Sequence, residues 1–397
     1  MKLLTFLGTT SYLTTTYCWT EKEKQKTTHL FPVALNEWLQ PDQVLVFLTE
    51  EAEKNINWRV LSDSIEATPI RIANGASEEE LWSIFNSIVE QVQEGDQLTI
   101  DITHGFRSLP LLGLLVSAYL KSTKKANVQH LLYGAFEARN KVKEETPVFE
   151  LTPFLSLFDW MIASDQFLQT GDGSPLCKLL VGDGPIGNLR NKVQELSEGL
   201  QLLRPNMVAQ SASELHDCIQ AAAKEIVASV PPATEMLDHI SSSYGRFVPT
   251  DDTPKQLLDA QLQMISWYVD RGQWVQALSL AREWLPSLLC VHFGEDVMDK
   301  AAREDMELLL NGGKVKSKDK GKTLKESPLL PQWQSLNTKK RLSNLWGGTL
   351  NLANLRNDVL HAGFRKNPKT PTDIQNSINE IVSELKLIWQ DFDGRLS

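Results

Sequence analysis

Cysteine is scarce in this sequence, and its positions follow no metal-binding or disulfide pattern. The chain has four cysteines, which are Cys18, Cys177, Cys218 and Cys290. None belongs to a Cys-x-x-Cys pair, so the spacing indicates neither a zinc site nor a disulfide framework. Isolated cysteines of this kind are typical of reduced thiols in a cytosolic protein.

Long hydrophobic runs are also missing. No stretch approaches the ~18 consecutive apolar residues of a membrane-spanning helix. The N-terminus, MKLLTFLGTTS, becomes polar too soon for a signal peptide. We therefore expect a cytoplasmic protein that does not bind membranes.

Positive charge is in deficit, with a formal net charge of −10 and a pI near 5.3. This balance argues against a broad basic surface for duplex nucleic acid, because such binding depends on many Lys and Arg contacts with phosphates. A local basic pocket for a short strand or a nucleotide is still compatible with it. With 397 residues, 42% of them hydrophobic, the chain is long enough for two or three domains.

Residues 1–151 alternate short apolar runs with helical patterns. This alternation predicts an α/β, Rossmann-like domain whose parallel sheet is covered by helices on both faces. One helix is predicted from the N-cap Ser77 to Val92, and another from Pro110 to Lys125. The six expected strands are Lys2–Leu7, Val44–Leu48, Thr68–Ile72, Gln97–Ile102, Val128–Tyr133 and Val148–Leu151.

From residue 152 the sequence is almost entirely helical. We divide this part into a helical connector, 152–253, and an all-α C-terminal domain, 254–397. The expected helices are Phe154–Gln169, Gly187–Leu203, Ala212–Val230, Pro254–Arg271, Trp274–Phe293 and Val297–Leu310.

Two loops at the carboxyl ends of predicted strands are rich in hydroxyl and backbone N–H groups. Gly8–Tyr12 follows the first strand, and Asp101–Pro110 follows the fourth and leads into a helix. Ligands of doubly wound sheets bind at this edge, and glycine beside a helix start favours anions. Arg107 adds a bidentate phosphate donor and His104 a hydrogen-bonding edge. Neither loop is a dinucleotide or Walker A motif. The alternative is that the second loop's polar residues only satisfy turn hydrogen bonds.

The same loops resemble the CARF domain (CRISPR-associated Rossmann fold) over roughly residues 1–150. The most specific part is the Asp-x-Thr-His-Gly-x-x-x-x-Pro run from Asp101 to Pro110, and Tyr133-Gly134-Ala135 adds to it. The resemblance implies binding of a cyclic oligoadenylate second messenger across the two-fold axis of two such domains. The residues implied to bind it are Gly8, Thr9, Thr10, Ser11, Thr103, His104, Gly105, Phe106, Arg107, Ser108 and Gly134.

A second cluster of reactive side chains lies near the C-terminus. Arg356 and His361 are five positions apart at the end of a helix predicted within Leu345–Leu360. Histidine serves as base or acid near neutral pH, and arginine stabilises charge on phosphate. The pair therefore suits metal-free RNA cleavage, in which a 2′-hydroxyl attacks the phosphate. Asn357 or Asp358 could orient the imidazole ring.

The pattern Arg356-Asn357-x-x-x-His361 resembles the HEPN ribonuclease motif, Arg-x4–6-His. The likeness covers about residues 254–397 but is sharp only at 355–364. Because this spacing is common by chance, the CARF-like loops far upstream give the motif its weight. The alternative is a helix-surface ion pair with a capping histidine.

Together the two resemblances imply a CARF–HEPN ribonuclease of type III CRISPR systems. Such a protein is activated by cyclic oligoadenylate, cleaves single-stranded RNA without metal or cofactor, and acts as a homodimer or higher oligomer. Two other functions stay open: a non-catalytic sensor, and a ring nuclease that degrades the messenger in the CARF-like pocket. The lysine-rich stretch Gly312–Lys325 is expected to be a flexible loop, either a simple surface insertion or a basic arm for RNA.

Overall fold

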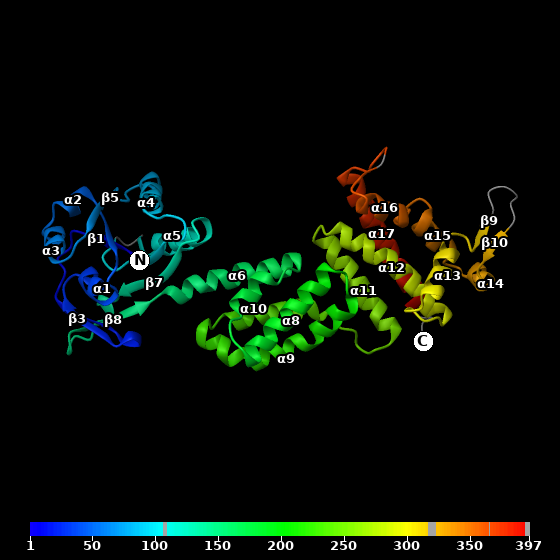
Figure 1. The fold of residues 1–397 in the computed structure, drawn as a ribbon, viewed down its shortest axis with the longest axis horizontal. Helices are drawn as coiled ribbons and strands as arrows, with labels where there is room; N and C mark the ends of the chain where they lie inside the picture. Colours follow the sequence, from blue (N-terminus) through cyan, green and yellow to red (C-terminus); the bar gives the residue numbers. More distant parts are fainter. Residues whose placement is uncertain (106–108, 317–322, 365, 394–397) are drawn as a thin grey trace. The chain divides into compact units, whose positions relative to one another are not determined.

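The computed structural model describes residues 1–105, 109–316, 323–364 and 366–393. The chain divides into two compact units, Met1–Asp159 and Trp160–Ser397 (Figure 1). The division falls inside helix α6 (Thr152–Thr170), which contributes residues to both units. No helix in the described ranges is long and apolar enough to cross a membrane.

The N-terminal unit is built on an eight-stranded sheet of order β3-β2-β8-β7-β6-β1-β4-β5. The strands are β1 (Lys2–Leu7), β2 (Thr15–Trp19), β3 (Lys24–Thr28), β4 (Gln43–Leu48), β5 (Thr68–Arg71), β6 (Gln97–Asp101), β7 (Asn127–Gly134) and β8 (Glu145–Glu150). From β7 to β5 all neighbours are parallel, whereas β8 is antiparallel to β7 and β3 to β2.

The predicted α/β fold class is confirmed, but the expected number of strands was wrong. The sheet has eight strands rather than six, and it is mixed rather than wholly parallel. The two strands not predicted are β2 and β3, with sequences TTYCW and KQKTT. Neither contains the continuous apolar run that marks a strand buried on both faces. The polar strand β3 lies at the edge of the sheet, and β2 beside it buries only alternate side chains.

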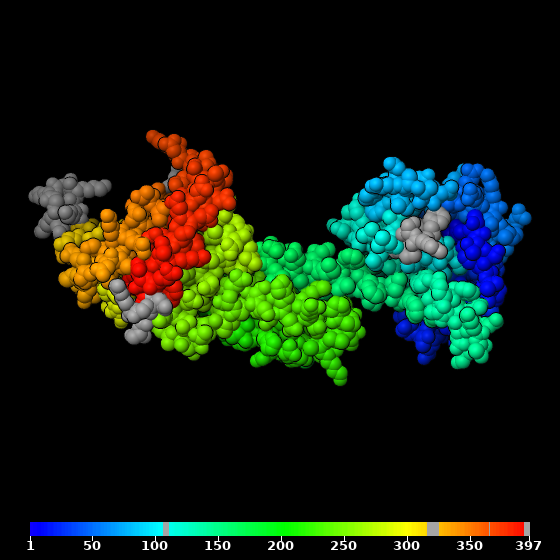
Figure 2. Space-filling view, turned by 180° about the vertical axis from the view of Figure 1, so that it is seen from behind, coloured from blue at the N-terminus to red at the C-terminus, as the bar shows by residue number. Residues whose placement is uncertain are grey.

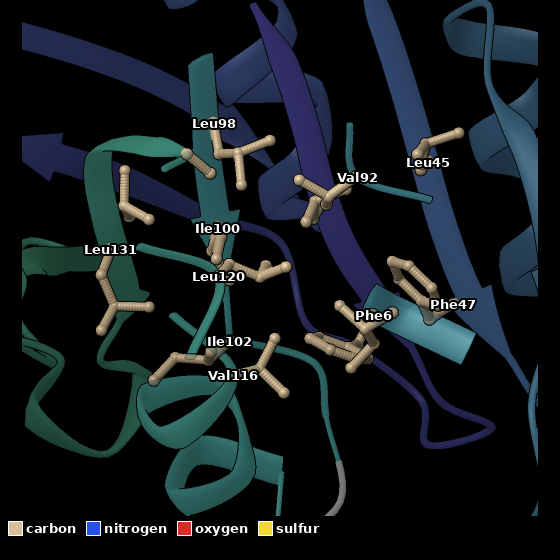
Figure 3. Close-up of a cluster of buried hydrophobic side chains, with 14 of the residues drawn as sticks. Phe6, Leu45, Phe47, Val92, Leu98, Ile100, Ile102, Val116, Leu120 and Leu131 are labelled. Carbon is tan, nitrogen blue, oxygen red and sulfur yellow. The ribbon is translucent and has the colours of Figure 1, made fainter. Parts of the chain in front are cut away.

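Alternating side chains of the central strands fill two separate cores. On one face Leu4, Phe6, Leu45 and Phe47 pack against helices α4 (Glu78–Glu90) and α5 (Leu109–Thr123), as Figure 3 shows for part of this cluster. On the other face lie residues of α1 (Phe31–Leu39), α2 (Glu50–Glu53) and α3 (Ile56–Ser64). The predicted N-cap at Ser77 is present, because its hydroxyl accepts the Glu80 N–H at 3.3 Å.

An apolar stripe remains exposed on the N-terminal unit. Leu111, Leu115 and Tyr119 follow one another at four-residue intervals on α5 and are 66%, 48% and 43% exposed. The stripe continues onto α4, where the Phe85 ring lies 5.1 Å from Tyr119 and 5.6 Å from Trp82. A contiguous apolar surface of this kind is typical of an interaction site. We call it the α4–α5 stripe.

The second unit is helical, with one short hairpin. Its elements beyond α6 are α7 (Ser174–Leu179), α8 (Gly184–Gln201), α9 (Pro205–Ser229), α10 (Ala233–Gly245), α11 (Pro254–Asp270), α12 (Trp274–Phe293), α13 (Lys300–Leu310), β9 (Lys314–Lys316), β10 (Thr323–Glu326), α14 (Leu330–Ser335), α15 (Lys339–Gly347), α16 (Leu352–Leu360) and α17 (Pro371–Asp393). Helices α8 and α9 pack together, and so do α11 and α12. The red helix α17 lies against α11 and α12 in Figure 2.

Two expectations for this unit were wrong. The single helix expected within Leu345–Leu360 is two helices, because Gly347 and Gly348 interrupt it and Asn351, at φ 48°, caps the second helix. A side chain at Gly348 would place its Cβ 2.7 Å from the Asn344 Cα. The lysine-rich stretch also contains structure: β9 and β10 pair antiparallel, with 317–322 outside the described residues.

A matched pair of isoleucines tests the core. Ile100 is 2% exposed beneath α4 and α5, whereas Ile56 at the start of α3 is 61% exposed. We expect Ile100→Ala to lower the free energy of unfolding by about 2–5 kcal/mol and Ile56→Ala by less than about 0.5 kcal/mol. Urea unfolding of the full chain measures both, and equal losses would contradict the described packing.

Candidate functional site

The loop after β1 has its carbonyl groups turned toward α3. The side-chain amide of Asn57 donates to the carbonyl oxygens of Gly8, at 3.1 Å, and Thr10, at 2.9 Å. Asn55 donates to the carbonyl of Thr9 at 3.4 Å. A trans peptide points its N–H opposite to its C=O, so the amides that follow point away from α3. They have no acceptor within the described residues, so they are available to an anionic group of a ligand.

Tyr12 closes this loop against the loop after β6. Its hydroxyl oxygen accepts the Gly8 N–H at 3.1 Å, and its ring lies 4.1 Å from the His104 ring. A Cβ at Gly8 would lie 3.0 Å from that hydroxyl and 3.4 Å from the His104 carbonyl oxygen. Glycine at position 8 therefore permits the two loops to approach each other.

His104 uses one ring nitrogen inside the protein. It is 7% exposed, and its Nε2 accepts the backbone N–H of Phe31 at 3.1 Å. Burial, with a smaller contribution from His29, lowers the pKa of His104 to about 3. The ring is thus neutral at pH 7 and carries its proton on Nδ1, as an accepting Nε2 requires. The hydrogen-bonding edge expected for a ligand is therefore only the Nδ1 side.

Asp101 holds the end of β6 from beneath the site. Its carboxylate is fully buried and accepts the Thr5 hydroxyl at 2.7 Å and the Thr103 N–H at 2.9 Å. Burial raises the pKa of Asp101 to about 6, although these hydrogen bonds favour the ionised form. The Thr103 hydroxyl accepts the Gly134 N–H at 2.8 Å, which ties β6 to β7. The turn-stabilising alternative thus describes Asp101 well.

Two adjoining cavities lie above these loops. One, of about 400 Å³, is lined by both loops and by Thr49, Glu51 and Asn74. The other, of about 280 Å³, has a more aromatic wall that includes Tyr17, Tyr133 and Phe136. Both share the wall formed by Thr10, Tyr12, Thr103 and His104.

The structure brings most of the sequence-predicted ligand residues to these cavities. Those that line one or both are Gly8, Thr9, Thr10, Ser11, Thr103, His104, Gly105 and Gly134. Phe106, Arg107 and Ser108 lie outside the described residues. The sequence did not indicate Asn57, because an asparagine inside an amphipathic helix carries no local sign of its partners. Only the fold places it beside a loop 47 residues earlier.

The second cluster lies at the end of α16. His361 is the C-cap residue and is exposed, and Ala362 and Gly363 follow in left-handed conformation, at φ 52° and 69°. The Gly363 N–H donates to the Asp358 carbonyl and the Ala362 N–H to the Val359 carbonyl, both at 3.1 Å. This is a Schellman ending in which Ala362 takes the first left-handed position, where glycine is most common, and Gly363 takes the next.

Arg356 is held near the same helix end. Its NH1 donates to the Asn357 Oδ1 at 3.1 Å, while its buried Nε has no hydrogen-bond partner in the described part of the chain. The Asp358 Oδ2 accepts the Lys369 N–H at 3.0 Å. The buried Nε is out of reach of a ligand, so only the terminal guanidinium N–H groups of Arg356 could meet an anion, and His361 offers an exposed imidazole. Across the described ranges, no three His, Cys, Asp or Glu side chains converge as a metal site would need.

Two parts of the chain match models of known protein families. Residues 2–137 match the family model described as CRISPR system endoribonuclease Csx1, CARF domain. Residues 156–250 match the model of CRISPR-associated protein MJ1674, second domain. The curated CRISPR-associated protein MJ1674 of Methanocaldococcus jannaschii is 22% identical over 206 residues, which are 51% of this chain and 31% of that protein. This chain therefore matches about a third of its relative's length.

A solved structure is similar along almost the whole chain. It is Enterococcus italicus Csm6 bound to cyclic hexa-2′-fluoro-hexa-dAMP, with 11% identity and a TM-score of 0.46. The match covers 99% of this chain and 94% of the other. The two family-model matches end at residues 137 and 250, so neither reaches Arg356 or His361, and these two residues are argued from sequence and geometry alone.

The buried carboxyl of Asp101 predicts a pH-dependent contribution to stability. Its folded pKa of about 6 exceeds the ordinary 3.8, so the folded state binds more protons between these values. Stability from this group is therefore present below pH 3.8 and lost as the pH rises through 6. We expect the unfolding free energy of Asp101→Asn, minus that of the wild type, to rise by up to about 3 kcal/mol from pH 4 to 7.

Urea unfolding at each pH measures this difference. Asp42→Asn is the control, because the amino terminus lowers the pKa of that exposed carboxyl and its difference should change in the opposite direction. If the unfolding free energy of Asp101→Asn minus that of the wild type did not vary with pH, the raised pKa of Asp101 would be contradicted.

Proposed function

The N-terminal unit is a CARF domain, and we propose that this chain is a cyclic-oligoadenylate sensor whose helical unit is a metal-independent endoribonuclease. In this proposal the messenger binds the loops after β1 and β6, and its binding activates cleavage of single-stranded RNA at Arg356 and His361. The setting is antiviral defence by a type III CRISPR system. The observation that carries the sensing half is the set of loop amides that Asn57 directs away from α3.

The chemistry of the two cavities supports a nucleotide ligand. Convergent amides and hydroxyls at Thr9, Thr10 and Ser11 suit phosphate and ribose oxygens. The aromatic wall formed by Tyr133 and Phe136 suits a base. One protomer offers one set of loops, so a cyclic ligand with repeated adenylates matches two copies related by a two-fold axis.

The α4–α5 stripe supports a homodimer as the working state. It is apolar and exposed, and α5 begins directly after the β6 loop. Pairing two copies through α5 would therefore bring two β6 loops toward the same axis. Exposed Leu111, Leu115 and Tyr119 would then be buried, which is favourable at about 25 cal/mol for each Å².

The residues at the end of α16 support RNA cleavage by transesterification. The imidazole of His361 takes the proton from a 2′-hydroxyl, or gives one to the leaving 5′-oxygen, and Arg356 meets the charge that develops on the phosphate. Two proton transfers need two imidazoles or a second donor, which a dimer provides by pairing His361 with its copy. The products are a 2′,3′-cyclic phosphate and a 5′-hydroxyl, and DNA is not cut.

The sensing half is tested at Asn57. Asn57→Asp keeps the side-chain shape but replaces the donating amide by a carboxylate that repels the loop carbonyls. We expect a loss of affinity for cyclic oligoadenylate of about 5- to 150-fold, because hydrogen bonds of this kind contribute about 1–3 kcal/mol when a partner is left unsatisfied. Calorimetric titration with rings of four and six adenylates measures the loss.

Asn127→Ala is the control for that experiment. Asn127 is exposed at the amino-terminal end of β7, the edge of the sheet opposite the loops. Its variant should bind as the wild type does. Wild-type affinity in Asn57→Asp would mean that the loop amides do not hold the ligand.

The catalytic half is tested at His361. We expect His361→Ala to reduce ligand-stimulated cleavage of single-stranded RNA by about 10²–10⁴-fold with EDTA present, because a general acid or base contributes that much. Ligand affinity should stay unchanged. His239→Ala, at an exposed histidine on α10 in the same unit, should cleave normally.

Two outcomes would change the proposal in different ways. Undiminished activity in His361→Ala would remove this residue from the mechanism. A wild-type protein that binds the messenger but cuts no RNA would instead be a non-catalytic sensor.

A further inference from the structure

The loop between α16 and α17 folds back on the helix that carries His361. Asp358, only 5% exposed, holds both ends of the loop. Its carbonyl accepts the Gly363 N–H at 3.1 Å, and its Oδ2 accepts the Lys369 N–H at 3.0 Å. A Cβ at Gly363 would lie 3.4 Å from Pro368, so the two ends of the loop also lie close together. The orange-red segment there projects from the helical unit in Figure 1.

Phe364 stands in this loop with its side chain in solvent. It is 91% exposed, the largest exposure of any aromatic residue in the described ranges. Its N–H donates to the His361 carbonyl at 3.0 Å, so the phenylalanine is tied by the backbone to the imidazole-bearing residue. An exposed Phe gains nothing for the folding of this chain, whereas a flat ring three residues after the histidine proposed to cleave RNA has a direct use.

The charge of the loop favours an anionic partner. The sequence from His361 to Lys369, HAGFRKNPK, contains no acidic residue. Lys366 is exposed, and Lys369 is exposed with its Nζ 3.2 Å from the Ser377 hydroxyl. In a chain of net charge −10 this is a local basic segment next to an aromatic ring. Aromatic rings with flanking cations are the usual means of holding single strands, by stacking on bases and pairing with phosphates.

We propose that Phe364 stacks on an unpaired nucleobase next to the scissile phosphate, and that Lys366 contacts the adjoining backbone phosphate. This inference rests on the proposed ribonuclease function and specifies which feature of the RNA substrate is recognised. A base inside a duplex is already stacked on both faces and cannot offer one to Phe364. The loop thus selects RNA whose bases are unpaired at the cleavage point, and Asp358 positions the loop without touching the substrate.

The first experiment measures binding apart from cleavage. Fluorescent single-stranded RNA is titrated into full-length His361→Ala protein, with cyclic oligoadenylate present, and then into the same protein carrying a second change at Phe364. We expect Phe364→Ala to weaken binding about tenfold, Phe364→Trp to bind within about threefold of the parent, and Phe364→Leu to lose as much as alanine. Met298→Ala, at a residue 79% exposed in the same unit, should change nothing.

The second experiment tests whether the Phe364 ring stacks on one particular base of the RNA. The RNA substrate is prepared with one nucleotide lacking its base, at each position around the cleavage point in turn. At one position the wild type should lose about tenfold in kcat/KM, and Phe364→Ala should show no further loss there, because the two deletions remove the same contact.

Several results would overturn the proposal. One is wild-type binding and cleavage in Phe364→Ala. Another is full recovery with leucine, which would mean that Phe364 packs against protein. A third is dissociation of the dimer by Phe364→Ala in sedimentation, which would make the residue a contact between copies. A wild type that binds single strands through Phe364 but cuts none would remove the ribonuclease proposal, and with it the scissile phosphate of this inference, and would leave Phe364 as a single-strand contact alone.

Discussion

The orientation of one short loop determines which backbone groups the N-terminal unit presents at its cavities. Asn57 takes the carbonyls of Gly8 and Thr10, and the planarity of the peptide then turns the following amides away from α3. With its carbonyls turned outward the same loop would repel an anion. The direction of these amides therefore depends less on the loop's own side chains than on the side-chain amide of a helix residue beneath the loop.

Both candidate sites use backbone groups at the ends of strands or helices, where the regular hydrogen bonding of the element stops. Parallel strands end at one edge of the sheet, so the loops after β1, β4, β5 and β6 all reach the first cavity. At the other site α16 stops at His361, because Ala362 and Gly363 enter the left-handed region and return their amides to the helix. In each case a terminus makes polar groups available, and a buried residue, Asn57 or Asp358, fixes their direction.

The parts of the fold that could be predicted from sequence are those with strong local signals. Apolar runs placed β1 and β4 correctly, and the Ser77 cap placed α4. The strands β2 and β3 were missed because neither has a continuous apolar run. The edge strand β3 is polar, and β2 beside it buries only alternate side chains. The break before α16 was missed because the apolar spacing continues through Gly347 and Gly348. The loop residues of the site were predictable from their composition, whereas Asn57 was not, since long-range contacts leave no trace in local spacing. Arg107, predicted to hold phosphate, lies outside the described residues.

The protonation of two buried groups at the first site, His104 and Asp101, decides what charge the site carries. A lowered pKa leaves His104 neutral, so it adds no positive charge for an anionic ligand. Asp101, with a pKa of about 6, is still largely ionised at pH 7 and places a negative charge beneath the same loop. The Thr5 hydroxyl and the Thr103 amide offset part of this charge, but they cannot remove it. In the proposed complex, attraction of phosphate would therefore come from oriented amides rather than from the site's described side-chain charges. This is why the direction of the Gly8–Ser11 backbone outweighs any single side chain there.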